Sequence, residues 1–452
     1  MVESAMGYRY PAGSPSDVAA ALRIAAETGR SLVPRGSGYS YGDTSLNAED
    51  IVVDITPMNR ILAWDPHTGR IRVEAGATIR DIWTHTIGDG WWPAVVPGTM
   101  YPTVGGCLSV NVHGKNNWKE GAFAEHTEKI ELMMPDTQVV ECGPESNPQL
   151  FSAVAGGLGM LGIVLTATLR LRRTPTGMVR VVQIAAPDLN GMFSAFEEHA
   201  GSAGYLVGWI DGFAAGAALG RGLMQIATDD AETSLNGLSL ASQDLPERML
   251  GVVPRSRLWL AMKPTVNDPG MRLLNSARFH SGVARSGRSS QTALARFHFF
   301  HDYIPGWKRS FRPGGILQYQ VFVPQAQARS VFAALLKRSQ DADLTPYLIV
   351  MKRHRADTVL LGYNVNGYSL SLDYHATAGN LARLRSLLQC FTDDVVLPAG
   401  GRFYPAKDSI LNQDQARASF GASPVETFLE LKRRYDPQEI LQSNLYRRLL
   451  RA

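Results

Sequence analysis

The amino-acid sequence predicts an α+β fold of two domains, and three observations support this prediction. The 452 residues exceed the usual size of one domain and supply a large core. Before about residue 174 the expected strands are short and are mixed irregularly with helices, unlike the regular strand–helix alternation of a doubly wound sheet. Near Thr174 the pattern changes, and strand-like segments begin to alternate with helices.

The composition is that of an ordinary globular enzyme, with 45% hydrophobic and 19% charged residues. A net charge of +4 is too small to indicate nucleic-acid binding, and no basic stretch is interleaved with aromatic residues. No apolar run is long enough to cross a bilayer, and the N-terminus lacks the basic and apolar segments of a secretory leader. The three cysteines fit neither a metal site nor a disulfide framework, so we expect a cytoplasmic protein without a metal.

The first helix has clear start and stop signals. Ser14 can cap it, Pro15 suits its first position, Asp17 lies in its first turn and Gly29 can end it. The remaining expected elements of this half are strands at 31–34, 51–54, 61–64 and 70–75, and a helix that Thr78 caps and that runs to residue 87.

The first of three Gly-rich segments spans residues 33–43. Gly36, Gly38 and Gly42 can adopt positive φ and allow the backbone to approach a ligand closely. Successive backbone N–H groups in such a turn form a concave nest for an anion, above all a pyrophosphate. These residues alone fit an ordinary Gly-rich turn between strands equally well.

The second Gly-rich segment spans residues 97–116. We expect a buried strand at 107–112, because Ser109, Asn111 and His113 alternate there with apolar residues. On a strand these three polar side chains would share one face, where a bound ligand could supply their hydrogen-bond partners.

The third Gly-rich segment, residues 155–164, contains a G-x-G-x-x-G pattern at Gly157, Gly159 and Gly162. A dinucleotide fingerprint of the Rossmann type requires a helix after these glycines. A strand-like run to Leu171 follows instead, so we exclude that fold.

The second half of the chain is predicted from its strand and helix patterns. Strands are expected at 179–185, 205–210, 222–227, 317–323, 348–352 and 369–374, with a helix at 326–338. The polar stretches 228–244 and 281–290 contain few large apolar residues and are expected to be mobile loops. Two helical stretches are expected near the C-terminus, with Asp436-Pro437 between them.

Three separated Gly-rich segments in the first 165 residues indicate one elongated ligand, for which a dinucleotide is the natural candidate. At this point the sequence resembles the FAD-binding oxidoreductases of the vanillyl-alcohol oxidase type, which have a PCMH-type FAD domain. Within that family it resembles the decaprenylphosphoryl-β-D-ribose 2-oxidases over nearly the whole chain. The motifs that carry the resemblance are, in order, Arg35-Gly-x-Gly-x-Ser-Tyr-Gly-Asp43, Pro97-Gly-Thr99, Thr103-Val-Gly-Gly106, His113-Gly-Lys-Asn116, Trp209-x-Asp211, Leu317-Gln-Tyr-Gln320 and Ala406-Lys-Asp-Ser409.

The resemblance implies a domain organisation. Residues 1–174 would form the FAD-binding domain, and residues 175–399 a substrate domain with an antiparallel sheet and flanking helices. Residues 400–452 would return to the FAD domain and complete the active site.

The resemblance also implies which residues contact FAD. Many relatives attach the flavin covalently through a histidine in the first loop; Tyr39 occupies that place here, so we expect non-covalent FAD. The decaprenylphosphoryl-ribose enzymes have an arginine there. The implied FAD contacts are Pro34, Arg35, Gly36, Ser37, Gly38, Tyr39, Ser40, Tyr41, Gly42, Asp43, Gly98, Thr99, Thr103, Val104, Gly105, Gly106, Val110, Asn111, Val112, His113, Gly114, Ile163, Val164 and Tyr404.

Lys407 and His113 are the implied catalytic residues, and which of them takes the proton is left open. In a pocket that excludes water, the pKa of a lysine can fall enough for its amine to act as a base. The local sequence alone favours a different interpretation, in which Lys407 is a surface lysine that precedes an Asp-Ser helix cap. The implied substrate contacts are Lys115, Gln318, Gln320, Lys352, Ser369, Ser371, Trp209 and Tyr41. Ser371 replaces the cysteine that covalent inhibitors attack in the family, and Ser369 replaces an asparagine.

The implied activity is oxidation of a sugar secondary alcohol to a ketone, specifically the 2-hydroxyl of a polyprenylphosphoryl pentose. This would be the first half of an epimerisation in cell-wall arabinan synthesis, and a separate short-chain NAD(P)H-dependent reductase would complete it. Two alternatives are an oxidase of a soluble alditol or aldonolactone that uses oxygen, and a flavin-binding scaffold without turnover.

A lipid-linked substrate suggests peripheral contact with the inner face of the membrane. The basic C-terminal residues are candidates for it, although a solvated helix face explains them equally well. These residues are Lys432, Arg433, Arg434, Arg447, Arg448 and Arg451.

Overall fold

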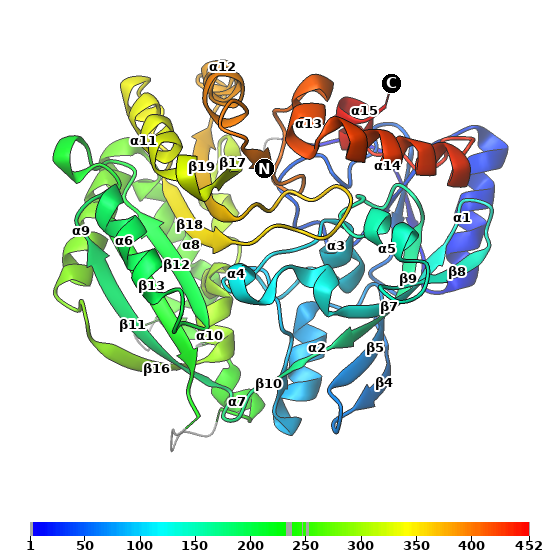
Figure 1. The fold of residues 1–452 in the computed structure, drawn as a ribbon, viewed down its shortest axis with the longest axis horizontal. Coiled ribbons are helices and arrows are strands. Elements are labelled where there is room, and N and C mark those ends of the chain that lie inside the picture. Colours follow the sequence, from blue (N-terminus) through cyan, green and yellow to red (C-terminus); the bar gives the residue numbers. More distant parts are fainter. Residues whose placement is uncertain (1–2, 232–236, 246, 250–252, 452) are drawn as a thin grey trace.

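The computed structural model describes residues 3–231, 237–245, 247–249 and 253–451. Two lobes lie side by side, one around the N-terminal strands and one around a large sheet formed mainly by the middle of the chain (Figure 1). The α+β class predicted from the sequence is confirmed.

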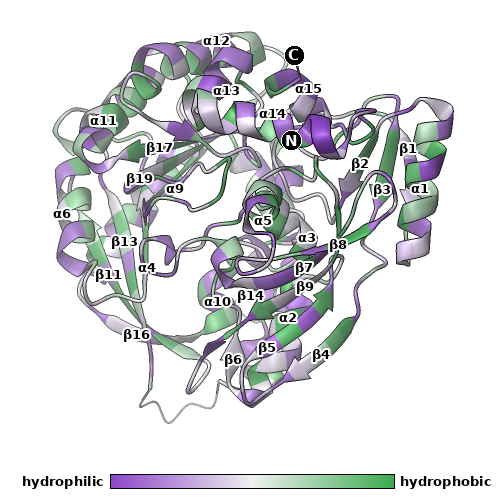
Figure 2. Cartoon of the chain, turned by 45° about the vertical axis from the view of Figure 1, so that its right-hand side comes forward, coloured by the Kyte–Doolittle hydropathy of each residue, from purple (hydrophilic) through white to green (hydrophobic). Residues whose placement is uncertain are grey.

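The N-terminal lobe begins with a small parallel sheet in the order β1-β3-β2. Helix α1 (Pro15–Thr28) packs on it and confirms the predicted signals: the Ser14 side chain accepts from the Asp17 amide, and Gly29 ends the helix at φ 65°. Hydrophobic and hydrophilic residues alternate along α1, as in helices that bury one face (Figure 2). The strands are β1 (Tyr8–Pro11), β2 (Leu32–Arg35) and β3 (Ile51–Asp54).

A five-stranded antiparallel sheet, in the order β4-β5-β9-β7-β8, completes this lobe. Strand β9 (Ile163–Arg170) follows the third Gly-rich segment directly, which confirms the exclusion of a Rossmann fingerprint. Helix α2 (Ile79–Thr86) begins at Thr78 with a capping box, as predicted. The other elements are β4 (Ile61–Asp65), β5 (Arg70–Glu74), β7 (Thr127–Met133), β8 (Val139–Cys142), α4 (Asn117–Glu120), α5 (Pro148–Val154) and the pair β6 (Trp91–Trp92) and β10 (Arg172–Arg173).

The strand predicted at 107–112 is wrong, because helix α3 (Val104–Ser109) occupies this segment. The Thr103 side chain caps it by accepting from the Gly106 amide, and Asn111 at φ 45° turns the chain after it. Ser109, Asn111 and His113 therefore do not lie on one strand face. Local capping prevails here over an alternating pattern of polarity.

The second lobe is built on an eight-stranded sheet in the order β16-β11-β13-β12-β18-β19-β17-β20, with antiparallel pairing throughout. All six strands predicted in this region are present. The strands are β11 (Met178–Ala186), β12 (Tyr205–Ile210), β13 (Gly222–Asp229), β16 (Ser289–Ala293), β17 (Gly315–Pro324), β18 (Leu348–His354), β19 (Gly367–Ala376) and β20 (Arg402–Phe403).

Helices flank this sheet (Figure 1). The loop predicted at 281–290 is wrong in part, because a helix runs to Val283 and β16 begins at Ser289. In the stretch 228–244, β13 extends to Asp229 and a short helix begins at Leu240, while residues 232–236 lie outside the described residues. The helices are α6 (Leu189–His199), α7 (Leu240–Gln243), α8 (Leu258–Met262), α9 (Asp268–Val283), α10 (Leu294–His298), α11 (Gln325–Asp341) and α12 (Leu381–Phe391), and β14 (Arg248–Met249) pairs with β15 (Val253–Pro254).

The described C-terminal segment returns to the N-terminal lobe. It contains three helices where two were expected: α13 (Gln413–Phe420), α14 (Ala422–Tyr435) and α15 (Asn444–Leu449). The Leu32 amide donates to the Ile440 carbonyl at 2.7 Å, and the Gln442 amide donates to the Leu32 carbonyl at 2.9 Å. The segment thus lies beside β2, which leads into the first Gly-rich loop. The division into 1–174, 175–399 and 400–452 stays a prediction.

Four of the six predicted basic surface residues form salt bridges, and among them Arg433 pairs with Glu426 and Arg451 with Glu439. Lys432 is buried, and its Nζ donates to Asp436 at 2.5 Å and to the carbonyls of Met160 at 2.9 Å and Leu441 at 2.6 Å. Arg448 forms salt bridges with Asp43 and Asp408. These charges hold the C-terminal segment on the N-terminal lobe, so the basic surface expected there is reduced.

None of the helices in the described ranges combines the length and the apolar character that a membrane span would need.

Candidate active site

A cavity of about 950 Å³ lies between the two lobes. This volume is at the upper end of the roughly 300–1,000 Å³ that is usual for ligand pockets, so it suits a large cofactor together with a substrate. Its wall combines all three Gly-rich segments, one face of the eight-stranded sheet, residues 296–309 and the segment from Tyr404 to Lys407.

The first Gly-rich loop offers unpaired backbone donors to this cavity. The amides of residues 36–40 donate to no other group in the described parts of the chain, although these residues line the cavity. Gly38 has φ 70°, and the loop is held in place because the Tyr41 amide donates to the Ala406 carbonyl at 2.7 Å. Consecutive free amides facing a cavity fit a pyrophosphate.

The three Gly-rich segments meet where close approach requires glycine. A Cβ on Gly36 would lie 2.1 Å from the Thr103 Oγ1 of the second segment. A Cβ on Gly159, at φ 76° in the third segment, would lie 2.8 Å from the Pro34 Cγ of the first. The convergence expected from the sequence is therefore present, and any larger residue at these positions would separate the segments.

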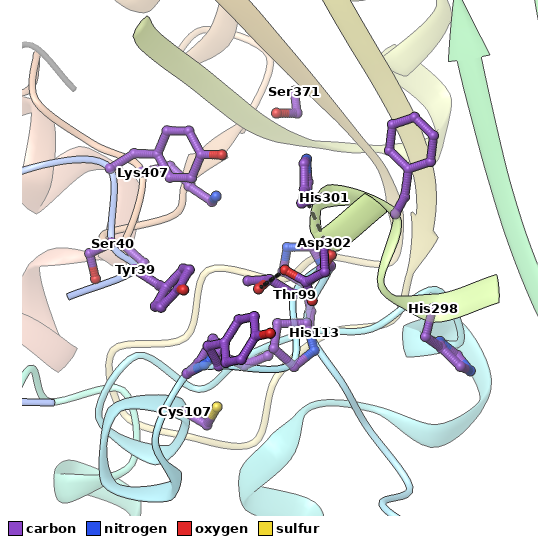
Figure 3. Close-up of a pocket in the computed structure, with 18 of the residues that line it drawn as sticks. Tyr39, Ser40, Thr99, Cys107, His113, His298, His301, Asp302, Ser371 and Lys407 are labelled. Atoms are coloured by element: carbon purple, nitrogen blue, oxygen red, sulfur yellow. Dashed lines mark hydrogen bonds between the residues drawn. The ribbon is translucent and has the colours of Figure 1, made fainter. Parts of the chain in front are cut away.

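Lys407 lines the cavity, and in the view of Figure 3 its Nζ points toward the other lining residues. Its Nζ lies 3.5 Å from the centre of the Tyr41 ring. Burial lowers the pKa of Lys407 to about 7, assisted by Lys308 and opposed by Asp373. A substantial fraction of this amine is thus neutral at physiological pH and can accept a proton.

His113 also lines the cavity, but its Nε2 is already engaged. The Gln320 Nε2 donates to it at 3.1 Å, so this imidazole nitrogen is an acceptor without a proton. Burial, assisted by Lys352, lowers the pKa of His113 well below its ordinary value. His113 is therefore a neutral residue fixed by Gln320.

Ser369 is oriented by hydrogen bonds behind the cavity wall. The Asn117 Oδ1 accepts from the Arg355 amide at 3.2 Å and from the His354 Nδ1 at 3.0 Å. The His354 Nε2 is then unprotonated and accepts from the Ser369 Oγ at 2.8 Å. Ser369 thus directs its proton away from the cavity and offers only lone pairs to a ligand.

Two further acceptors lie on the neighbouring strands. The Gln318 Nε2 donates to the Asp373 Oδ1, which leaves the Gln318 Oε1 and the Asp373 Oδ2 buried with no partner among the described residues. Burial raises the pKa of Asp373 to about 6, against the opposing effect of Lys407. Buried acceptors without partners on a cavity wall favour a ligand rich in hydroxyl donors.

Asp373 was missed by the sequence reasoning, although a signal was present. Ser369, Ser371 and Asp373 alternate along β19, and the structure places all three on the cavity wall. Continuing the two-residue alternation from Ser369 and Ser371 to the next position would have predicted that Asp373 also lies on the cavity wall.

Residues 296–309 were missed entirely, because this segment carries no Gly-rich pattern or motif. The Asp302 carboxylate accepts from the Thr99 Oγ1 at 2.7 Å and from the Met100 amide at 2.8 Å, so it fixes the second Gly-rich segment (Figure 3). The His301 ring lies beside Gly98, and burial lowers its pKa to about 4.

Lys115 and Lys352 are both half-buried and line the cavity. Burial lowers the pKa of Lys115 to about 7 and that of Lys352 to about 8. The Lys115 Nζ donates to the Phe297 carbonyl and lies 4.0 Å from the centre of the Phe297 ring.

Most of the predicted contacts lie on the cavity wall, Trp209, Ser371 and Tyr404 among them. Seven do not: Arg35, Gly42, Asp43, Val104, Asn111, Gly114 and Ile163. Arg35 donates to the Ser45 carbonyl, Asp43 pairs with Arg448, and the Asn111 Oδ1 accepts from the Ala124 amide. A Cβ on Gly42 would meet the Asp408 carbonyl oxygen at 1.7 Å. These residues support the loops from behind.

The free amides, the glycine contacts and the size of the cavity fit a dinucleotide cofactor, and the comparisons agree. Residues 10–143 match the FAD binding domain family. The protein is an FAD-dependent oxidoreductase with an FAD-binding domain of the vanillyl-alcohol oxidase type.

Among individual proteins, the chain is similar to the decaprenylphosphoryl-beta-D-ribose oxidase of Mycolicibacterium smegmatis. The two are 29% identical over 96% of this chain and 92% of that protein. It is also 30% identical to cytokinin dehydrogenase 10 of Oryza sativa subsp. japonica, over 39% of this chain and 34% of the relative. With the L-gulonolactone oxidase of Mus musculus it shares 29% identity over 36% of each chain.

We predict that FAD is released when the protein is denatured. Tyr39 occupies the loop position expected for covalent attachment, and its ring stacks on Tyr101 with the centroids 6.1 Å apart. After acid precipitation the yellow flavin should appear in the supernatant, measured by absorbance. Flavin that stays in the precipitated pellet would contradict the prediction.

Proposed function

We propose that this protein oxidises the 2-hydroxyl of a polyprenylphosphoryl pentose to a ketone, as the first half of an epimerisation. The observation that carries the proposal is the half-buried Lys407 side chain, with a pKa of about 7, in a cavity whose wall also holds unpaired acceptors of the sheet. The similarity over 96% of the chain to an oxidase named for decaprenylphosphoryl ribose supports the choice of substrate.

Oxidation of a secondary alcohol removes one hydride from carbon and one proton from oxygen. FAD, when bound, supplies the hydride acceptor. In our proposal the Lys407 Nζ takes the hydroxyl proton, because it is neutral for much of the time near pH 7. His113 is the weaker candidate, since its Nε2 already accepts from Gln320.

The other cavity residues would bind and orient the sugar. Ser369, Gln318 and Asp373 present lone pairs that can accept hydrogen bonds from hydroxyl groups. Lys115 and Lys352 would bind the phosphate, because each gains a full charge when an anion approaches. A separate short-chain NAD(P)H-dependent reductase would then reduce the ketone.

An anaerobic titration of the flavin tests this function directly. A polyprenylphosphoryl pentose should bleach the visible flavin band in proportion to the amount added, and the matching free pentose should not. Bleaching by a soluble alditol or aldonolactone, with hydrogen peroxide formed in air, would select the alternative oxidase. A flavin that none of these compounds reduces would indicate a scaffold.

We predict that compounds which trap a cavity thiol leave turnover unchanged, because the cavity holds Ser371 where the family has a cysteine. Cys107 is the cysteine of this cavity wall, and burial raises the pKa of its thiol and keeps it neutral. The variant Ser371→Cys should become sensitive, measured as time-dependent loss of activity. A covalent adduct on Ser371 in the unaltered protein would overturn the prediction.

A further inference from the structure

The charges of this protein are distributed very unevenly along the chain. Residues 253–312 contain eleven lysines and arginines and only two acidic residues, Asp268 and Asp302, which gives this segment a net charge of +9. The whole chain has a net charge of +4, so the remaining residues together carry −5. A strongly basic segment in an otherwise acidic chain indicates an anionic partner.

These basic side chains have no salt-bridge partner among the residues that the structure describes. Other arginines do form salt bridges, such as Arg172 with Asp229 and Arg221 with Asp211. Arg257, Lys263 and Arg272 are exposed on or next to α8 and α9. Their charge is therefore available to a ligand at the surface.

Large apolar side chains are exposed on the same elements. Leu260 of α8 is 52% exposed, Leu273 and Leu274 of α9 are 71% and 44% exposed, and Phe300 is 55% exposed. Basic residues lie beside two of these positions: Arg272 directly precedes Leu273 in α9, and the Arg278 guanidinium is 5.9 Å from the centre of the Phe300 ring. Exposed apolar groups next to unpaired positive charges fit the headgroup region of an anionic bilayer.

This surface is continuous with the wall of the cavity. Arg278, Phe300, Trp307 and Arg309 line the cavity and belong to the same basic segment. The Arg309 guanidinium lies 5.8 Å from the centre of the Trp259 ring, which connects the cavity wall with α8. The cavity wall on this side is thus in contact with α8, the helix that carries Leu260. Helices α8 and α9 both belong to the lobe of the large sheet (Figure 1).

We propose that α8, α9 and residues 300–309 form a docking surface for the anionic face of a phospholipid bilayer. Leu260, Leu273 and Leu274 would enter the headgroup region, and the basic side chains around them would bind lipid phosphates. The role of this surface rests on the proposed function, because a lipid-linked substrate would enter the cavity from the bilayer. Binding to vesicles can nevertheless be measured without turnover.

Sedimentation with vesicles of an equal mixture of phosphatidylcholine and phosphatidylglycerol tests the proposal on the FAD-loaded protein. We expect binding to this mixture, weak binding to pure phosphatidylcholine, and a loss of binding as salt is raised. A protein that stays in the supernatant with both kinds of vesicle at low salt would overturn the proposal.

Two variants separate the apolar and the charged contributions. The triple variant Leu260→Ser, Leu273→Ser, Leu274→Ser should lose most of the binding. The triple variant Arg257→Gln, Lys263→Gln, Arg272→Gln should bind roughly a hundredfold more weakly, at about fivefold for each charge. None of these six residues lines the cavity, so reduction of the flavin by a dissolved substrate should be unchanged.

A matched control removes three apolar side chains that are exposed on the other lobe, with the variant Ile24→Ser, Leu62→Ser, Val139→Ser. Its vesicle binding should equal that of the unaltered protein. If the charge variant loses binding and the leucine variant does not, the protein adsorbs to the bilayer through charge alone, and the proposed entry of the leucines into the headgroup region is overturned. Vesicle binding without flavin reduction by any pentose would contradict the proposed substrate and leave the docking surface intact.

Discussion

Replacing Lys407 with methionine is expected to lower kcat by about 10²–10⁴-fold, the range found when a general base is removed. Methionine keeps the length and the packing of the side chain over the Tyr41 ring but cannot accept a proton. FAD content and thermal unfolding should remain close to those of the unaltered protein, because methionine preserves the contact with the Tyr41 ring. Anaerobic single-turnover reduction of the flavin measures the effect on the chemical step.

The variant Lys407→Arg distinguishes a base from a positive charge. Arginine retains the charge but does not lose its proton in proteins, so it should be as inactive as methionine. If arginine restores turnover, Lys407 only positions the substrate. In the unaltered protein kcat/KM should fall as the pH drops below about 7, where the Nζ becomes protonated, and should level off above that pH.

The second large effect is expected on stability. Replacing Lys432 with methionine should lower the free energy of unfolding by about 3–5 kcal/mol, the usual effect of removing one partner from a buried ion pair. The Lys432 and Asp436 side chains are 1% and 0% exposed, so the carboxylate would remain buried without its counter-charge. Urea unfolding followed by circular dichroism, with saturating FAD in every sample, measures the change.

The chain provides a matched control for this prediction. Lys337 and Asp341 have the same spacing of four residues on a helix and a similar separation of 2.8 Å, but their side chains are 68% and 60% exposed. The variant Lys337→Met should therefore change the free energy of unfolding by less than about 0.5 kcal/mol. Equal losses for the two variants would show that burial does not determine the contribution of these pairs.

Local signals predicted the regular elements well. Ser14 and Thr78 begin their helices as capping residues should, and the alternating apolar runs of the second half form the strands of the large sheet. The prediction failed at 107–112, where a helical turn capped by Thr103 replaces the expected strand. An alternating pattern of six residues is too short to outweigh a capping residue and the close packing that Gly105 permits against Ala75.

The sequence predicted the part of the cavity wall that the Gly-rich loops form. It did not predict the part formed by residues that only tertiary packing brings to the cavity. The meeting of Gly36 with Thr103 follows from the composition of their loops. Asp302 lies on the wall because tertiary packing brings it to Thr99, which is 203 residues away in the sequence. Lys432 was interpreted as a surface charge, since nothing local indicates that its helix is buried on that side.

The contact between the first Gly-rich loop and the C-terminal segment has a consequence for synthesis in the cell. The Tyr41 amide is held by the Ala406 carbonyl, and β2 is flanked by Ile440 and Gln442, which leave the ribosome several hundred residues after the loop. A nascent chain therefore carries the free amides of the loop long before they are fixed in place. FAD should bind stably only after residues 406–442 have been synthesised, and products that stop before residue 405 should remain without flavin and be removed by quality control.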